Sequence, residues 1–548
     1  MALMGQMMTM PLLISSLIQH AARHSGDTEI VSKRCEGDLH RYTWRDAERR
    51  SRQVAQALGR LGLSPGDRVA TLAWNGYRHL ELYYGSSGSG LVCHTINPRL
   101  FPEQIVWIAQ DANDQVLCFD LSFLPLVEKL SAQLPGIHHY VLMSDRAHMP
   151  AATSIPNLLC YEELVVAEDG HYRWPEFDEN TASSICYTSG TTGHPKGAVY
   201  SHRSSVLHAY GSALPDAMDC SSKDVILPVV PMFHVNAWGL PYSSAIVGAK
   251  LVFPGPHLDG KSLYELFETE GVTFSAGVPT VWLGLLTYVK SNGLKFSSFK
   301  RTVIGGSACP PAMLATLMDD FGVEVIHAWG MTELSPLGTL SKLTSKQLAL
   351  PAEQQRRILE KQGKVIYGID MAVINDEGQA LPWDAQSSGN LVVRGHWVIS
   401  SYFGEPRSPL VTVDGQPGWF PTGDVATIDA DGFMQITDRS KDVIKSGGEW
   451  ISSIDLENIA MAHPAVHEAA AIACAHPKWD ERPLLVVVKK PDAQVTREEL
   501  LAFFEGRIAK WQIPDDVAFV AEIPHTATGK IQKLKLREQF KSYRLPSA

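Results

Sequence analysis

Short apolar runs alternate with segments of helical periodicity along the chain up to about residue 360. The runs are rich in β-branched residues and have the length of buried strands; they cover residues 69–72, 116–119, 225–227 and 251–253. Apolar positions at helical spacing occur between them, for example at residues 44–62 and 262–270. This alternation predicts an α/β fold with buried, largely parallel sheets.

The pattern changes after residue 363. Up to residue 438, short strands are interrupted by Gly and Asp, as in residues 389–395 and 429–433, which predicts a small β-rich subdomain. A charged segment with two glycines, residues 438–448, then precedes a separate α/β pattern. We therefore expect three parts: a large N-terminal domain (1–438) of mixed α/β sheet subdomains plus the β-rich one, a hinge (439–444), and a smaller, mobile α/β C-terminal domain (445–548).

The N-terminal segment has an amphipathic pattern at Leu12, Leu13, Leu17 and Ile18. It lacks a basic lead-in and a small-residue cleavage site, so a first helix is favoured over a signal peptide. No window reaches the roughly 18 to 20 apolar residues of a membrane span, which predicts a protein without a transmembrane segment.

Length, net charge and cysteine spacing indicate what kind of protein this is. A length of 548 residues exceeds what one core normally supports, so at least two domains are expected. The net charge of -11 gives no global attraction for nucleic acid. The eight cysteines contain no Cys-x-x-Cys pair, which favours reduced thiols in a cytoplasmic protein over a zinc site or a disulfide framework.

The most informative stretch is a Ser-, Thr- and Gly-rich loop that follows an apolar strand at residues 184–187. Its glycines allow backbone N–H groups to face an anion, its hydroxyls add donors, and a lysine adds positive charge, which is the chemistry of a polyphosphate cradle. A flexible polar turn is the simpler alternative. The loop does not have the spacing of a Walker A motif, which disfavours a conventional P-loop ATPase. The predicted phosphate ligands are Thr188, Ser189, Gly190, Thr191, Thr192 and Lys196.

This loop resembles the phosphate-binding signature of the adenylate-forming superfamily, which contains acyl-CoA synthetases, adenylation domains of peptide synthetases and luciferases. Further motifs follow in the family's order, so the resemblance extends over nearly the whole chain. They lie at residues 231–239, 305–308, 328–333, 419–424, 438–442, 445–450 and 528–530.

The resemblance implies a nucleotide and metal site. Thr188 and Glu333 would hold Mg²⁺, and Thr332 would contact the α-phosphate of ATP. Asp424 would bind the ribose. The adenine would lie against Gly306, His327, Ala328 and Trp329, where Trp329 replaces the family's common tyrosine.

A second set of implied residues belongs to the C-terminal part. Lys530 would reach the active site and stabilise the attack of the carboxylate on the α-phosphate, although by composition it is one solvated lysine among several. Residues assigned to the nucleotide from this part are Arg439, Lys441, Lys445 and Trp450. The segment with Gly447, Gly448 and Trp450 would line the route of coenzyme A.

The carboxylic acid is expected in an apolar tunnel behind His234, which is also assigned to catalysis. Trp238 would gate this tunnel, and Gly305 and Gly306 would allow the backbone close to the reacting carboxylate. His234 and Trp238 share one side of a helix if the segment is helical. The alternative is that both are core residues.

These assignments together predict an AMP-forming acyl-CoA ligase that uses ATP, Mg²⁺ and coenzyme A, acts on a small carboxylic acid and forms a homodimer. The resemblance is greatest to bacterial medium- and long-chain fatty acyl-CoA synthetases of the alkane-degradation type, which favours medium-chain fatty acids. Ligases for 3-methylthiopropionate or aromatic acids remain alternatives. A luciferase-like oxygenase, a peptide-synthetase module and a non-catalytic ATP-binding regulator are less favoured.

Overall fold

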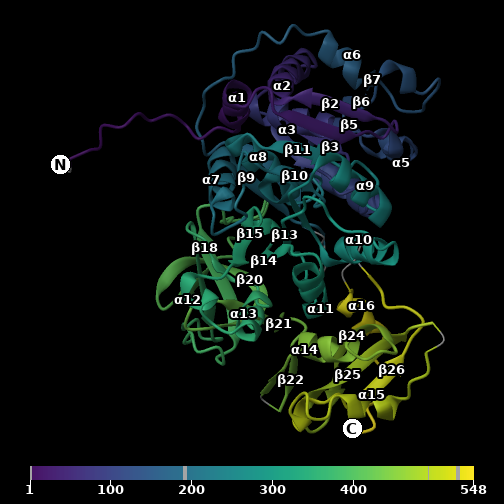
Figure 1. Cartoon of the computed structure of the whole chain (residues 1–548). Helices are drawn as coiled ribbons and strands as arrows, with labels where there is room; N and C mark the ends of the chain where they lie inside the picture. The colour runs from purple at the N-terminus through teal and green to yellow at the C-terminus, as the bar shows by residue number, and fades with distance from the viewer. Residues whose placement is uncertain (1–2, 189–193, 448, 492, 526–530, 548) are drawn as a thin grey trace. The chain divides into compact units, whose positions relative to one another are not determined.

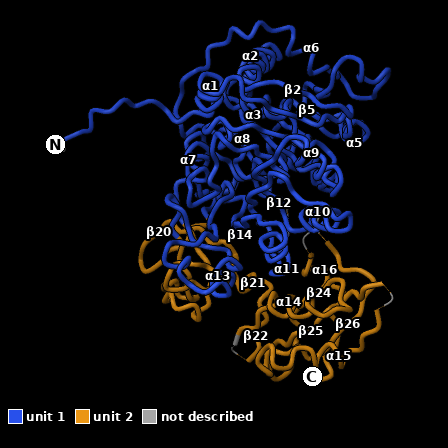
Figure 2. Tube along the Cα trace, viewed as in Figure 1, with its two compact units in different colours: residues 1–188, 195–370, 394–408 blue, residues 189–194, 371–393, 409–548 orange. Residues whose placement is uncertain are grey.

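The computed structural model describes residues 3–188, 194–447, 449–491, 493–525 and 531–547 (Figure 1). The chain divides into two compact units (Figure 2). The first contains Met1–Thr188, Pro195–Asp370 and Arg394–Ser408, and the second contains Ser189–His194, Met371–Val393 and Pro409–Ala548. The predicted hinge at 439–444 falls inside the second unit, so the domain boundaries expected from the sequence stay a prediction.

The first unit contains a nine-stranded sheet. Its strands, in spatial order, are β16 (Lys364–Val365), β15 (Leu337–Ser341), β14 (Glu324–Gly330), β13 (Arg301–Ile304), β12 (Phe274–Gly277), β10 (Val225–Pro228), β11 (Lys250–Phe253), β1 (Glu29–Lys33) and β2 (Leu39–Thr43). All pairs from β14 to β1 are parallel, and antiparallel strands complete both edges. The predicted buried parallel sheet is therefore confirmed.

A second, seven-stranded sheet lies in the same unit. Its order is β7 (Leu158–Cys160), β6 (His139–Leu142), β5 (Asp114–Phe119), β3 (Arg68–Leu72), β4 (Val92–Thr95), β8 (Ala182–Tyr187) and β9 (Gly197–Ser201). Only β8 and β9 pair antiparallel, with Tyr187 opposite Gly197. The predicted phosphate loop therefore connects two hydrogen-bonded strands, which fixes the positions of its two ends.

Helices cover these sheets. The N-terminal segment forms the predicted first helix, and Thr43 caps the second through a capping box with Asp46. The third helix is buried along its whole length. The helices of this unit are α1 (Ile14–His24), α2 (Trp44–Arg60), α3 (Tyr77–Gly88), α4 (Pro102–Asp111), α5 (Leu124–Leu130), α6 (Tyr161–Val166), α7 (His202–Ala213), α8 (Leu240–Val247), α9 (Gly260–Glu270), α10 (Pro279–Ser291), α11 (Pro311–Ala315), α12 (Ser345–Leu348) and α13 (Ala352–Leu359).

The second unit contains most of a β-rich sheet and a separate α/β sheet. The β-rich sheet is formed by β17 (Ile369–Ile374), β18 (Gly389–Gly395), β20 (Gln416–Ile428), β19 (Val411–Val413) and β21 (Met434–Arg439). The other is formed by β23 (Glu449–Ile451), β22 (Ile444–Ser446), β25 (Asp480–Lys489), β24 (Val466–His476) and β26 (Asp516–Phe519). Helices α14 (Ser453–Met461), α15 (Arg497–Phe503) and α16 (Lys533–Gln539) accompany the latter. The β-rich subdomain and the separate α/β pattern that the sequence predicts are both confirmed.

A buried polar cluster connects the two sheets inside this unit. Asp438, fully buried at the end of β21, accepts hydrogen bonds from the backbone N–H (2.5 Å) and the hydroxyl (2.9 Å) of Ser453 at the start of α14. Lys533 of α16 donates to the same hydroxyl and pairs with Glu457 at 2.6 Å. The charged segment at residues 438–448 therefore begins at Asp438, whose position is fixed by these hydrogen bonds with Ser453.

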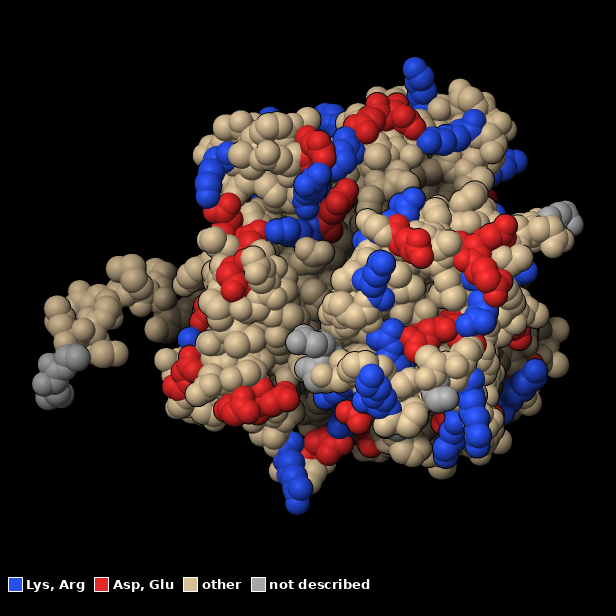
Figure 3. All heavy atoms as spheres, turned by 90° about the horizontal axis from the view of Figure 1, so that it is seen from below, with Lys and Arg blue, Asp and Glu red and all other residues tan. Residues whose placement is uncertain are grey.

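None of the helices within the described ranges combines the length and the apolar character that crossing a membrane requires. On the face drawn in Figure 3, the described Lys and Arg side chains are interspersed with Asp and Glu. The sequence contains 59 acidic and 48 basic residues, so side chains of both signs are expected on the surface.

Candidate functional site

The two ends of the predicted phosphate loop are joined in the first unit. The backbone N–H of Thr188 donates to the carbonyl of Lys196 at 2.9 Å, and the Thr188 hydroxyl accepts from the N–H of Lys196 at 3.0 Å. These bonds continue the β8–β9 ladder by one step. They hold Lys196 at the base of the loop, where a lysine can face a polyphosphate.

Glu333 lies in a short 3-10 turn, η6 (Thr332–Leu334), directly after β14. Its side chain is only 6% exposed, and its carboxylate accepts a hydrogen bond of 2.6 Å from the Tyr402 hydroxyl. The Glu333 carbonyl accepts from the backbone N–H of Ile399 at 2.9 Å. The segment after β18 therefore holds both the backbone and the side chain of the predicted metal ligand.

The same tyrosine also contacts the phosphate-loop lysine. The Lys196 ammonium lies 5.0 Å from the centre of the Tyr402 ring, and it is 3.7 Å from the Glu405 carboxylate. The backbone N–H of Phe403 donates to the Gly197 carbonyl at 2.8 Å. Lys196 and Glu333, which lie far apart in the sequence, thus contact one aromatic side chain, the ammonium over its ring and the carboxylate at its hydroxyl.

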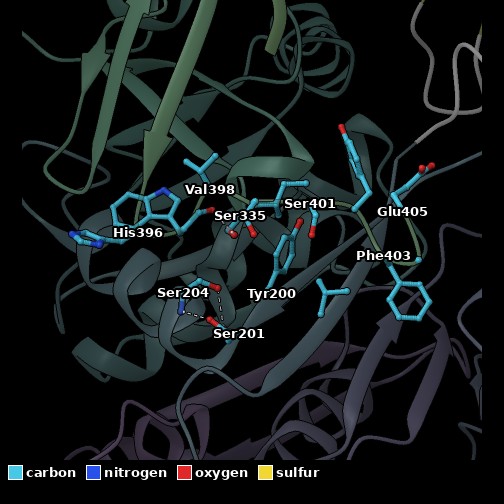
Figure 4. A pocket seen from close by; sticks show the side chains of 15 residues that line it. Tyr200, Ser201, Ser204, Ser335, His396, Val398, Ser401, Phe403 and Glu405 are labelled. Carbon is cyan, nitrogen blue, oxygen red and sulfur yellow. Dashed lines mark hydrogen bonds between the residues drawn. The ribbon is translucent and has the colours of Figure 1, made fainter. Parts of the chain in front are cut away.

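A pocket of about 530 Å³ is lined in part by this segment, including Tyr402 and Glu405 (Figure 4). It is lined by β9, the start of α7, Ser335 and residues 396–405. The close-up shows Tyr200, Ser335 and Ser401 near one another, and the Tyr200 hydroxyl donates to the carbonyl of Thr332 at 2.5 Å. Neither Trp238 nor Gly305 lines this pocket, so it is distinct from the predicted acid tunnel.

The predicted adenine residues lie at the carboxyl ends of β13 and β14, where open α/β sheets bind ligands. The side chain of His327 is 1% exposed and bonded at both nitrogens, to the Glu360 carbonyl and the Cys309 N–H. Burial lowers its pKa to about 4. The imidazole is therefore a neutral structural group. Ala328 and Trp329 are buried beside it.

The predicted acid-binding residues converge. A Cβ atom at Gly305 would lie 3.0 Å from the Ala328 carbonyl oxygen and 3.2 Å from the Trp238 indole. Gly306 has a φ of +79° and also faces Trp238. A side chain at Gly305 would be crowded by the indole and the backbone, and the positive φ of Gly306 favours glycine there. His234 is half-buried next to the same turn.

The turn that carries Trp238, η4 (Val235–Gly239), has an unusual backbone. Four successive non-glycine residues, from Val235 to Trp238, have positive φ angles between 46° and 55°. His234 and Trp238 therefore do not share the face of an ordinary helix, and the helical reading of their spacing is wrong. Left-handed residues of this kind cost about 1 kcal/mol or more each, and such strain gathers at functional sites.

Buried hydrogen bonds hold this turn in place. The Asn236 amide donates to the Ser184 hydroxyl at 3.0 Å and accepts from the Tyr83 hydroxyl at 3.2 Å. Tyr83 also donates to the Met232 carbonyl. The strand before the phosphate loop and the buried helix α3 thus fix the position of Trp238 through Asn236.

In the second unit, Asp424 and Arg439 are cross-strand partners on β20 and β21. Their side chains form an ion pair of 2.8 Å, in which the aspartate is 2% exposed. Two predicted nucleotide ligands therefore come together. The carboxylate of Asp424 offers oxygen acceptors of the kind that ribose hydroxyls need.

The predicted coenzyme A segment forms a hairpin of β22 and β23, in which Lys445 is opposite Trp450. The Lys445 ammonium is 5.8 Å from the Trp450 ring. Gly447 has a φ of +60°, and a Cβ atom there would lie 2.7 Å from the Trp479 ring. Lys441 lies between β21 and β22, next to Asp442, which pairs with Arg537 of α16 at 2.8 Å.

Several predicted residues lie outside the described part of the chain: Ser189, Gly190, Thr191, Thr192, Gly448 and Lys530. The structure also shows neighbours of the site that sequence reasoning missed, namely Tyr402, Tyr200 and Asn236. Asn236 lies inside a motif that drew attention for its His and Trp. No spacing rule connects Tyr402 with Glu333, because the sheet topology alone brings them together.

Comparison with known proteins tests the family. The sequence family "AMP-binding enzyme" matches residues 17–403, and "AMP-binding enzyme C-terminal domain" matches residues 455–530. The chain belongs to the AMP-binding enzyme family. The match covers most of the chain, so the resemblance to adenylate-forming acyl-CoA synthetases that the motifs indicated is confirmed.

Relatives of this AMP-binding enzyme are similar along their whole length. It is 55% identical over 539 residues to the 3-methylmercaptopropionyl-CoA ligase of Ruegeria lacuscaerulensis, covering 98% of this chain and 99% of that one. It is 53% identical over 539 residues to the medium-chain-fatty-acid–CoA ligase of Ectopseudomonas oleovorans, covering 98% of each. Among solved structures, the anthranilate CoA ligase AuaEII in complex with anthranoyl-AMP matches with a TM-score of 0.82 and 25% identity, over 97% of this chain and 98% of that one. The predicted fold class is thereby confirmed.

Proposed function

We propose that the protein joins a carboxylic acid to coenzyme A in two steps. In the first, a carboxylate oxygen attacks the α-phosphorus of ATP and pyrophosphate leaves, which gives an acyl adenylate. In the second, the thiol sulfur of coenzyme A attacks the acyl carbon, AMP leaves and the thiol proton is released. The observation that carries this proposal is the contact of both Lys196 and Glu333 with Tyr402, the lysine over its ring and the glutamate at its hydroxyl.

A cation and a buried carboxylate at one place suit a bound nucleoside triphosphate with its metal. The Lys196 ammonium would contact phosphate oxygens. The Glu333 carboxylate and the Thr188 hydroxyl offer the oxygen donors that Mg²⁺ prefers, so these residues fit the ion that the family implies. Mg²⁺ held by these two residues would supply positive charge beside the phosphates.

For the acid, we propose a medium-chain fatty acid. The apolar contact of Trp238 with Gly305 and Gly306 supports an apolar acyl group, as does the medium-chain relative. A short thioether acid is the second candidate, because a 3-methylmercaptopropionyl-CoA ligase is 55% identical over 539 residues, against 53% for the medium-chain relative. A cytoplasmic location and a homodimer stay predictions.

The test uses purified protein with ATP, Mg²⁺, coenzyme A and a panel of acids from acetate to octadecanoate, together with 3-methylmercaptopropionate. We expect AMP, pyrophosphate and acyl-CoA in equal amounts, with the highest kcat/KM for straight-chain acids of medium length. Formation of ADP would contradict the adenylate mechanism. A maximum at 3-methylmercaptopropionate would favour the second candidate and leave the reaction class unchanged.

A further inference from the structure

Tyr402 makes two contacts with charged residues of the candidate site, although no motif of the sequence singles it out. Its hydroxyl donates to the Glu333 carboxylate at 2.6 Å, and its ring lies 5.0 Å from the Lys196 ammonium. Both contacts lie within the first unit. The tyrosine is therefore placed between the group that would hold the metal and the group that would hold phosphate.

We infer that Tyr402 is a positioning residue for adenylate formation, which orients the Glu333 carboxylate toward Mg²⁺ and supports Lys196 through its ring. This inference rests on the proposed function. A carboxylate rotates freely about its last torsion unless a donor fixes it. The hydrogen bond from Tyr402 supplies that constraint, as groups behind a metal ligand commonly do.

The backbone around Tyr402 is fixed well enough for this role. On one side, Ile399 donates to the Glu333 carbonyl at 2.9 Å, and the Trp397 indole donates to the Leu337 carbonyl at 2.9 Å. On the other side, Phe403 donates to the Gly197 carbonyl at 2.8 Å. The tyrosine is thus held between β9 and the turn of Glu333.

The test is the dependence of pyrophosphate release on Mg²⁺ concentration. Tyr402→Phe removes one oxygen and keeps the ring beside Lys196. We expect the Mg²⁺ concentration for half-maximal rate to rise about tenfold, the lower end of what loss of a supporting partner costs a metal site. The KM for ATP at saturating Mg²⁺ should change little. Tyr402→Leu also removes the ring, and should raise that KM several-fold. Tyr210→Phe, on an exposed tyrosine of α7, is the matched control.

A double-mutant cycle separates positioning from a general loss of structure. Glu333→Gln should raise the Mg²⁺ requirement by itself, and Tyr402→Phe added to it should change that requirement less than about twofold, because coupled residues are not additive. Glu333→Asp, which keeps the charge but shortens the reach to the hydroxyl, should resemble Tyr402→Phe. If Tyr402→Phe folds poorly, the Mg²⁺ titration of Glu333→Asp can be used in its place to test the hydrogen bond between the two residues.

The outcomes are distinct. A Mg²⁺ titration of Tyr402→Phe that matches the Tyr210→Phe control, while Glu333→Gln shifts, would overturn the inference and leave the proposed function intact. Full additivity of the two changes would also overturn it. An unshifted titration of Glu333→Gln would remove the metal role of Glu333 and the inference with it. Absence of AMP and acyl-CoA from the wild-type reaction would instead overturn the proposed function.

Discussion

At the residue scale, a few side chains are held in positions that their local sequence does not favour. Trp238 is 8% exposed on a left-handed turn, where its indole meets Gly305. The energy that such a backbone costs must come from burial and from the Asn236 hydrogen bonds. The position of the indole is therefore specified by contacts far away in the sequence.

Replacing Trp238 tests its role as a gate. Trp238→Ala removes the indole beside Gly305 and Gly306 and leaves a cavity there. We expect the preferred acid to become longer and the KM for medium-chain acids to rise about tenfold, while the KM for ATP stays within about twofold. Steady-state kinetics over the acid panel measures this. The exposed Trp383 provides the control Trp383→Ala. An unaltered acid profile would assign Trp238 to the core.

How far the sequence predicts the site can be judged on these residues. The apolar runs at residues 69–72 and 251–253 predict strands because burial alone sets their composition. Lys196 follows from the chemistry of the Ser-, Thr- and Gly-rich loop, and Glu333 from the family motifs. The contact of Tyr402 with Glu333 follows from neither, because it depends on the packing of one segment across β9 and β14. The sequence also does not predict the positive φ angles from Val235 to Trp238. Glycine is the usual sign of such angles, and none occurs in this segment before Gly239.

At the element scale, a buried ion network joins three helices of the first unit. Arg50 of α2 pairs with Glu81 of α3 at 2.7 Å and with Glu162 of α6 at 2.9 Å. Arg78 of α3 pairs with Glu162 at 2.8 Å. Burial tends to raise the pKa of Glu162, but the guanidinium groups of Arg50 and Arg78 lower it to about 2.

The network predicts a specific loss of stability in acid. Because the pKa of Glu162 is lower in the folded protein than in the unfolded chain, its contribution is complete above about pH 4.5 and declines as the pH falls toward 2. Glu162→Gln should cost about 3 kcal/mol at pH 7, since it leaves two buried cations with one partner fewer. Its deficit relative to wild type should shrink in acid.

Urea unfolding at pH 7 and near pH 3 measures that difference. The neighbouring Glu163, with a side chain that is 55% exposed, provides the control Glu163→Gln, which should change stability by less than about 0.5 kcal/mol. A deficit of Glu162→Gln that stays constant with pH would show that folding does not lower the pKa of Glu162.

At the scale of the whole molecule, the predicted ligands are divided between two units. Lys196, Thr332, Glu333 and the acid-binding residues belong to the first, whereas Asp424, Arg439 and the Lys445 hairpin belong to the second. Such a division suits a reaction in two steps, because the second unit can supply one group of residues for the first step and another group for the second step. The family resemblance assigns Lys530 to the first step and the Gly447 segment to the second.

The two half-reactions should therefore respond differently to Lys530→Ala. Loss of one preorganised cation beside the attacked phosphate should slow acyl-adenylate formation by about 10² to 10³. Attack of coenzyme A on added acyl adenylate should change much less. Rapid-quench kinetics on each step measures this. Lys535→Ala, on an exposed residue of α16, is the control. Equal damage to both steps would mean that Lys530 supports folding or both reactions.

The left-handed turn has a consequence for redesign of the acid specificity. At position 238 the φ of +55° admits glycine and asparagine readily, but it disfavours valine, isoleucine and threonine, whose branched Cβ atoms clash with the local backbone. In a mutant library that randomises this position, variants whose side chain does not fit this backbone conformation will be destabilised, whatever acid is used in the assay. Variants with a shallower pocket will come more easily from aromatic or amide side chains than from branched aliphatic ones. With Trp238 proposed as the gate, we expect the shape of the main chain as well as the volume of the side chains to limit the diversity of acids that this scaffold accepts.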